Sequence, residues 1–277
     1  MKLPVQRFKK LKSSIFIACL FCVISCSTNA QSDDNIEDPI EEEEIIEEET
    51  EETTDAKYDI SSILAIYDNL SSVSYSISGT TVTFTTSNLP NHKSPYYKDT
   101  EWHDDLYEDY TGSNSSFRLN PNRIDEQDIT LSIPLHPKKA TSLTQTPMGP
   151  IGISRNGVVF FNQYAAGRAD LDGEINSFDQ FLGHPTGTSM YHYHIEPTFL
   201  TDTFGEDALL GLLSDGFPVY GPKEGNETIT SSDLDEYHGH FGATKEFPKG
   251  IYHYHVTADA PYINGDGFYG TPGTVAR

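Results

Sequence analysis

The tetrapeptide Tyr-His-Tyr-His occurs twice in the chain, as residues 191–194 and as residues 252–255. A Gly-His pair precedes each copy, Gly183-His184 before the first and Gly239-His240 before the second. Successive side chains of a β-strand point to opposite faces. If each copy is a strand, its two histidines lie on one face and its two tyrosines on the other. The chain is therefore expected to contain two copies of one strand motif, each presenting a histidine pair.

Two imidazoles at positions i and i+2 of a strand can bind the same metal ion. Two such strands side by side would bring four imidazoles together, and the Gly-His pairs could add two more. Neutral imidazole suits zinc, copper, iron and nickel, so we expect copper or zinc, with iron as an alternative. The pattern leaves open whether the strands share one site or form two. The predicted metal ligands are His184, His192, His194, His240, His253 and His255.

A purely structural role for these histidines is the alternative, with each ring bonded to backbone groups. Without a metal, however, several imidazoles on one face would repel one another as they protonate near their ordinary pKa of about 6.5. All three cysteines, Cys19, Cys22 and Cys26, lie near the N-terminus. No thiolate or disulfide is available to the rest of the chain, which excludes a cysteine-type structural zinc site there.

The N-terminus resembles a lipoprotein signal. Residues 1–25 carry five basic residues and no acidic one, and the apolar run Ile15–Ile24 is too short to span a bilayer. The run ends in Val23-Ile24-Ser25-Cys26, which resembles the bacterial lipobox, in which the cysteine is diacylated. We therefore expect residues 1–25 to be a signal peptide and Cys26 to be lipidated; an ordinary signal peptide is the alternative. Ser27 is unlike an inner-membrane retention signal, so the predicted location is the outer membrane, on its periplasmic face or at the cell surface.

Residues 26–56 are predicted to form a disordered acidic tether behind the lipidated cysteine. Asp33–Asp55 contains fourteen acidic residues and no basic one. Such a run repels itself and cannot bury a core. The whole chain has 42 acidic against 18 basic residues, a net charge of −24, which argues against a nucleic-acid partner. The expected partners are the outer membrane, through the lipid anchor, and a metal ion; a protein or glycan partner is not specified.

Residues 57–277 are long enough for one domain, and their patterns predict mainly strands. Alternating apolar residues predict strands at 73–77, 82–84, 129–135, 217–220 and 251–257, and Asn156-Gly157 predicts a hairpin over 151–161. Asp59 caps a short amphipathic helix, whereas residues 206–213 fit either a helix or a strand. The predicted fold class is mainly β, a single antiparallel β-rich, sandwich-like domain after a signal peptide and an acidic tether.

The doubled motif resembles the YHYH-domain proteins, which are bacterial secreted or lipoprotein domains. The resemblance covers most of residues 87–273 and implies no particular reaction. It implies His92 as a candidate further ligand, and it places Leu182 and Tyr237 where other members often have cysteine. It is carried by Leu89-Pro90-Asn91-His92, Ile133-Pro134-Leu135, Gly149-Pro150-Ile151-Gly152, Asn156-Gly157-Val158, Gly183-His184-Pro185, residues 215–221, Leu234-Asp235-Glu236, Gly239-His240, Pro261-Tyr262 and both tetrapeptides.

Acidic residues near the histidines are candidates for a further ligand or for orienting an imidazole. Glu196 continues the alternation of the first tetrapeptide, while Asp215, Asp235 and Glu236 lie in the blocks shared with the YHYH-domain proteins. The segment 170–176 resembles a calcium loop, but its glycine falls at position 4, where an EF-hand requires it at position 6. We interpret that segment as an acidic surface loop.

Three functions fit these observations. The first is a cell-envelope lipoprotein that binds or handles a transition metal. The second is a metalloenzyme whose open metal site activates water or dioxygen, with Glu196, Asp215 or Glu236 transferring the proton. The third is an adhesion or glycan-binding module without a metal, in which exposed tyrosines stack on sugars. The common zinc-protease, serine-hydrolase and phosphate-loop signatures are absent from the sequence, so an enzyme class is not indicated.

Overall fold

The computed structural model describes residues 58–277. The expected signal peptide, the lipidated Cys26 and the acidic tether lie outside the described residues. The described part is 32% strand and 16% helix, which confirms the predicted β-rich class. No helix within residues 58–277 has both the length and the apolar character needed to cross a membrane.

Sixteen strands and seven short helices follow one another within residues 58–277. The strands are β1 (Val73–Ser78), β2 (Thr81–Thr86), β3 (Ile129–Pro134), β4 (Lys139–Gln145), β5 (Pro150–Ser154), β6 (Val159–Phe161), β7 (Gly183–Pro185), β8 (Tyr191–Tyr193), β9 (Leu209–Leu213), β10 (Pro218–Tyr220), β11 (Lys223–Glu224), β12 (Glu227–Thr228), β13 (Gly239–Gly242), β14 (Ile251–His255), β15 (Gly267–Gly270) and β16 (Thr274–Ala276). The helices are the 3₁₀ helices η1 (Ile60–Tyr67), η2 (Pro95–Tyr97), η3 (Ala166–Arg168), η4 (Leu171–Ser177) and η5 (Ser231–Asp233) and the α-helices α1 (His103–Leu106) and α2 (Thr198–Phe204).

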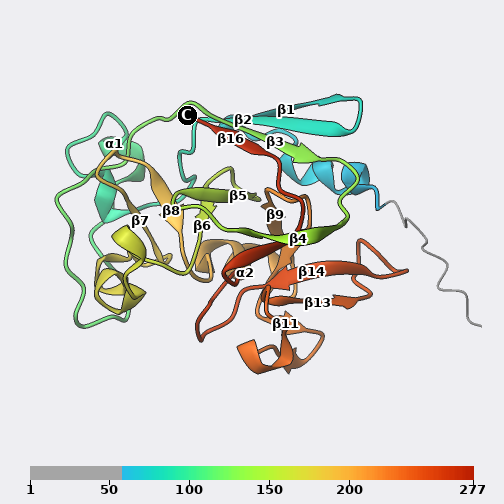
Figure 1. The fold of residues 1–277 in the computed structure, drawn as a ribbon. Helices are drawn as coiled ribbons and strands as arrows, with labels where there is room; N and C mark the ends of the chain where they lie inside the picture. The colour runs from blue at the N-terminus through green and yellow to red at the C-terminus, as the bar shows by residue number, and fades with distance from the viewer. Residues whose placement is uncertain (1–57) are drawn as a thin grey trace, which may run out of the picture. The chain divides into compact units, whose positions relative to one another are not determined.

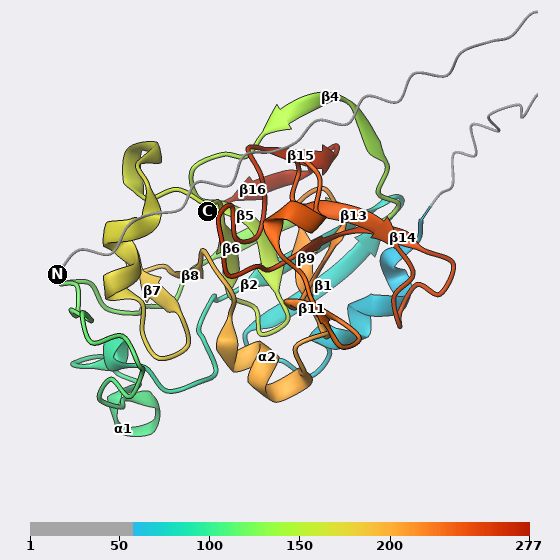
Figure 2. The ribbon, with the colours of Figure 1, turned by 90° about the horizontal axis from the view of Figure 1, so that it is seen from below.

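The largest sheet has eight strands in the order β13-β14-β10-β9-β5-β6-β8-β7. Its pairing is the same in both directions from the central antiparallel pair of β9 and β5. Moving outward, β10 and β6 pair antiparallel with the central strands, and β14 and β8 then pair parallel with β10 and β6. The edge strands β13 and β7 pair antiparallel with β14 and β8. Figures 1 and 2 show β7 and β8 at one end of the sheet and β13 and β14 at the other. The two tetrapeptide strands therefore lie far apart, separated by four strands.

The two halves of this sheet also repeat in sequence. The hairpin of β5 and β6 turns at Asn156-Gly157, and the hairpin of β9 and β10 turns at Asp215-Gly216. Both glycines have φ near +90°, at 87° and 88°, a conformation that favours glycine. The Asn-Gly hairpin prediction is confirmed, and its counterpart shows that the domain is built from two similar halves.

A smaller antiparallel sheet, in the order β1-β2-β3-β16, packs against one face of the large sheet. The predicted strands at 73–77 and 82–84 are confirmed as β1 and β2, which pair as a hairpin. Side chains of both sheets and of η1 form one buried core, which gives the sandwich-like arrangement. That core includes Ile60, Leu64, Val82, Phe84, Leu131, Ile133, Ile153, Val159 and Leu212.

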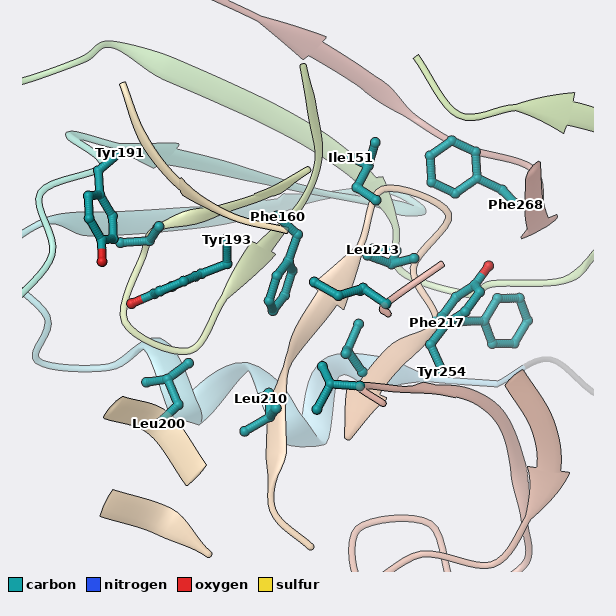
Figure 3. Packing of buried hydrophobic residues seen from close by; sticks show 14 of the residues in the cluster. Ile151, Phe160, Tyr191, Tyr193, Leu200, Leu210, Leu213, Phe217, Tyr254 and Phe268 are labelled. Carbon is teal, nitrogen blue, oxygen red and sulfur yellow. The ribbon is translucent and has the colours of Figure 1, made fainter. Parts of the chain in front are cut away.

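A second core covers the opposite face of the large sheet. It contains the tyrosines of both tetrapeptides, and Figure 3 shows Tyr191 and Tyr193 at one end of the cluster and Tyr254 at the other. Leu210 and Leu213 of β9 lie between them. The large sheet is therefore buried on both faces, and its tyrosines are core residues.

Three details differ from the sequence-based expectation. The large sheet is not wholly antiparallel, because β6 pairs with β8 and β10 with β14 in parallel. Parallel neighbours need a long crossover, and both crossovers contain the segment that carries a Gly-His pair. The predicted helix after Asp59 is the 3₁₀ helix η1, in which the Asp59 side chain accepts a hydrogen bond from the Ser61 backbone N–H. The undecided segment 206–213 contains β9, a fully buried strand.

Candidate metal centres

The structure forms two separate histidine clusters, one at each end of the large sheet. The β8 centre consists of His184, His192 and His194, and the β14 centre consists of His240, His253 and His255. In both, an edge strand places its Gly-His histidine directly opposite the first histidine of the tetrapeptide, His184 opposite His192 and His240 opposite His253. The six predicted ligands thus come together as two groups of three.

The imidazoles of each centre converge through their Nε2 atoms. At the β8 centre, His192 Nε2 lies 3.1 Å from His184 Nε2 and 2.9 Å from His194 Nε2. At the β14 centre, His240 Nε2 lies 3.1 Å from His253 Nε2 and 3.2 Å from His255 Nε2. Two nitrogens that bind one zinc ion tetrahedrally at 2.0–2.1 Å stand roughly 3.3 Å apart. The nitrogens are therefore already spaced as ligands of one ion.

Hydrogen bonds at Nδ1 fix which nitrogen faces the centre. His192 Nδ1 lies 3.1 Å from the Met190 carbonyl and His194 Nδ1 lies 2.6 Å from the Asn162 carbonyl. A carbonyl only accepts hydrogen bonds, so each Nδ1 must carry the proton and donate it. In a neutral imidazole, Nε2 then holds an unprotonated lone pair. These two lone pairs face each other across 2.9 Å.

The third ring of the β8 centre is held in the same way. Ser177 Oγ donates to the Glu174 carbonyl at 2.8 Å and lies 2.8 Å from His184 Nδ1. Because its own proton is already used, the Ser177 hydroxyl accepts from His184 Nδ1, and His184 Nε2 is also left as a lone pair. Three lone pairs directed at one point repel one another unless a cation lies between them.

The β14 centre repeats this arrangement for the two histidines of its tetrapeptide. His253 Nδ1 donates to the Ile251 carbonyl at 3.0 Å, and His255 Nδ1 donates to the Gly221 carbonyl at 2.7 Å. Gly221 follows β10 as Asn162 follows β6, so the acceptors of His255 and His194 occupy equivalent places in the two halves. Both centres are pre-oriented by backbone groups of the same sheet.

Burial disfavours a proton as the cation between the imidazoles. The three histidines of the β8 centre are each 2% exposed. Burial and the neighbouring His184 and His194 hold the pKa of His192 well below its usual range. Burial also lowers the pKa of His194 and of His255 to about 4. The imidazoles of His192, His194 and His255 are therefore neutral and able to bind a metal ion at neutral pH.

Each centre has an adjacent carboxylate that sequence analysis did not single out. Glu174 of η4 places Oε1 3.3 Å from His184 Nε2, and Glu224 of β11 places Oε1 3.1 Å from both His240 Nε2 and His253 Nε2. Its contact with His184 lowers the pKa of Glu174, although burial raises it. Burial raises the pKa of Glu224, but its interactions with His253, His240 and His255 outweigh burial and leave it lowered.

Other acids expected near the histidines have structural partners instead. Asp235 accepts from the Tyr252 hydroxyl at 2.8 Å and from the Tyr237 and Gly239 backbone N–H groups. Asp179 does the same in the first half, accepting from the Tyr191 hydroxyl at 2.9 Å and from the Gly183 N–H. These two carboxylates anchor the turns that deliver the Gly-His strands, so they position the centres without joining them.

The remaining candidates lie away from both centres. His92 Nε2 lies 3.1 Å from the Tyr193 hydroxyl, and the ring of His92 packs against Phe181 and Phe199 on the tyrosine side of the sheet. Glu196 accepts from the Thr201 hydroxyl at 2.6 Å. Glu236 is exposed and borders a surface hollow. None of the three belongs to a ligand cluster within residues 58–277.

Gly183 is required because the ring of Tyr191 crosses directly over it. A Cβ at this position would lie 2.5 Å from Tyr191 Cζ and Oη. Gly183→Ala is therefore expected to destabilise the protein by about 1–3 kcal/mol through overpacking, and to weaken metal binding at the β8 centre by shifting His184. Gly187→Ala is the matched control, because nothing lies within 4 Å of its Cβ. Equal urea midpoints for the two variants would contradict this account.

Asp215 is a buried support of the second half. Its carboxylate accepts from the Tyr254 hydroxyl at 2.6 Å and from the Gly270 and Phe217 N–H groups, and burial raises its pKa to about 6. Asn156 occupies the equivalent turn position and donates to the Tyr193 hydroxyl at 3.3 Å.

Asp215→Ala is expected to lower the free energy of unfolding by about 3 kcal/mol, because it leaves three donors without a partner. Asp215→Asn, which copies the first half, should cause less than half of that loss, because its amide can still hydrogen-bond to Tyr254. Chemical denaturation of both variants measures the difference. A milder effect for alanine than for asparagine would disprove the supporting role.

Comparison with known proteins gives a family for the part of the chain that contains both centres. The family model described as YHYH protein matches residues 130–230 and, in a second segment, residues 223–266. The first segment contains the β8 centre, and the second contains the whole β14 centre including Glu224. Searches of curated proteins and of solved structures gave no match. The family match thus spans the large sheet and both histidine clusters.

Proposed function

Residues 130–266 of this chain belong to the YHYH protein family, and we propose that the protein is a cell-envelope lipoprotein that binds two transition-metal ions. The observation that carries the proposal is the convergence of three Nε2 atoms at each centre. At the β8 centre all three rings use Nδ1 as the donor, so no proton is left to bridge the nitrogens. A metal ion removes this repulsion and binds all three.

The donor set favours particular metals. Three neutral imidazoles with a nearby carboxylate suit zinc or copper, and also iron, whereas calcium and magnesium prefer oxygen ligands. The described residues contain no cysteine, so soft thiolate coordination is excluded at both centres. Zinc or copper is the ion we propose, with iron as the alternative.

The other binding function considered from the sequence has less support. A glycan module would need the tyrosines of the tetrapeptides on the surface as stacking platforms. Tyr191, Tyr193 and Tyr254 are 0% exposed, and Tyr252 is 2% exposed. These rings are packed in the core beneath the sheet, which favours metal binding over sugar stacking.

Elemental analysis of the untagged protein tests metal binding. We expect two equivalents of zinc or copper per chain, in protein purified without a polyhistidine tag and reconstituted with each metal. The control replaces His192, His194, His253 and His255 together with alanine and should hold no metal. Equal metal content in the wild-type protein and in this variant would contradict the proposal.

The lipoprotein part of the proposal is supported by sequence alone. The apolar run Ile15–Ile24 ends at a lipobox-like Cys26, and an acidic segment separates Cys26 from the domain. Diacylation of Cys26 would hold the domain at the outer membrane, facing the periplasm or the medium. Cys26→Ser should move the protein from the membrane pellet to the soluble fraction, with Cys22→Ser as the control. Membrane association that survives Cys26→Ser would exclude this anchor.

A further inference from the structure

The carboxylates of the two centres are placed differently. Glu224 Oε1 lies 3.1 Å from His240 Nε2, 3.1 Å from His253 Nε2 and 3.6 Å from His255 Nε2. It thus lies against all three imidazoles of the β14 centre, and the four donor atoms all stand within 4.8 Å of one another. Four donors around one point make a closed tetrahedral set, as structural zinc sites have.

The β8 centre has only three donors in such a group. The donor nitrogens of His184, His192 and His194 lie within 4.8 Å of one another, and no carboxylate among residues 58–277 completes this group. Glu174 Oε1 lies 3.3 Å from His184 Nε2, beside that ring rather than over all three. Its position follows from η4, whose last residue, Ser177, is bonded to His184 Nδ1. The helix end thus fixes Glu174 to one side of the centre.

The unfilled side of the β8 centre faces a cavity. All three imidazoles and Glu174 line a cavity of about 620 Å³, whose other polar walls include Asn120 and Asn122. The cavity beside the β14 centre is smaller, about 300 Å³, and Glu224 lines it together with His253 and His255. At the β14 centre the carboxylate that lines the cavity lies 3.1–3.6 Å from all three Nε2 atoms, whereas at the β8 centre it contacts His184 at the edge of the cluster.

We propose that the two centres have separate roles: the β14 centre is closed by Glu224, and the β8 centre binds a small exogenous oxygen- or nitrogen-donor ligand at a fourth position. Water fills this position when no other ligand is present, and Glu174 accepts a hydrogen bond from it. Three protein ligands with one open position are typical of catalytic zinc sites. This inference rests on the proposed function, since it requires a metal at each centre.

Azide binding to the cobalt(II)-substituted protein tests the inference, because azide adds to an open position and changes the visible spectrum of cobalt. The wild-type protein with two cobalt ions should bind one azide. His253→Ala with His255→Ala, which keeps only the β8 centre, should retain the full azide-dependent change. His192→Ala with His194→Ala, which keeps only the β14 centre, should show none.

Removal of Glu224 supplies the decisive variant. In the protein that keeps only the β14 centre, Glu224→Ala should open the fourth position and create an azide response, whereas Glu227→Ala on the neighbouring strand β12 should not. An azide response of the β14 centre with Glu224 intact, or two azides bound by the wild type, would overturn the inference while leaving metal binding intact. Cobalt bound by neither centre would instead overturn the proposed function.

Discussion

Replacing His192 and His194 together with alanine is expected to reduce the metal content of the protein from two ions to one. The two centres lie at opposite ends of an eight-stranded sheet and share no ligand. Removing two of the three donors at the β8 centre therefore abolishes that site and leaves the β14 centre occupied. His253→Ala with His255→Ala should give the mirror result, and metal analysis after gel filtration measures both.

His92 provides the matched control for this experiment. It is a buried histidine of the same domain, 4% exposed, and it contacts Tyr193 rather than either centre. His92→Ala should lower stability but keep two metal ions. If either double variant lost both ions, or kept both, the assignment of two independent three-histidine centres would fail.

Removing the metal is expected to destabilise the folded protein strongly. A ligand that binds only the folded state stabilises it by about 4 kcal/mol when its free concentration is about a thousand times its Kd. With two independent centres the contributions should add, so metal-loaded protein should unfold at a clearly higher denaturant concentration than chelator-treated protein. The variant with one centre should show roughly half of the increase.

The pH dependence of this stabilisation follows from the lowered pKa values. Burial holds the pKa of His194 and of His255 at about 4, below the ordinary value of about 6.5 that applies in the unfolded chain. Without metal, the unfolded state takes up protons first, so stability should fall as the pH drops from about 6.5 to about 4.

His194 and His255 themselves stay neutral through most of that range. The metal-dependent increase in stability should therefore persist at pH 6 and disappear toward pH 4. Denaturation curves with metal and with chelator at a series of pH values measure both effects. A metal-dependent increase that vanished already near pH 6.5 would indicate exposed surface histidines as the ligands.

The sequence predicted the strands better than their arrangement. The alternation of Val82 and Phe84 and the Asn156-Gly157 turn depend on neighbours in the chain, and both hairpins are confirmed. The parallel pairing of β6 with β8 joins segments separated by η3, η4 and β7, and no local pattern encodes it. The question of one metal site or two depended on this long-range order, and the sequence left it open.

The two carboxylates beside the centres were also not predictable from local sequence patterns. Glu174 lay in a segment interpreted as an acidic surface loop, and Glu224 lay in a short stretch without periodicity. Each precedes the Gly-His pair of its own half, at different spacings, so only the repeated geometry relates them. Glu196 follows the strand alternation but is turned to Thr201, because β8 ends at Tyr193 and the chain then enters α2 at Thr198.

Anomalous diffraction from crystals of the zinc-loaded protein tests the central claim most directly. The account predicts two anomalous peaks. One should lie about 2.0–2.1 Å from the Nε2 atoms of His184, His192 and His194, and the other at the same distance from those of His240, His253 and His255. Peaks confined to the protein surface, a single ion elsewhere, or zinc bound through Nδ1 would contradict the account of two metal centres built by the repeated motif.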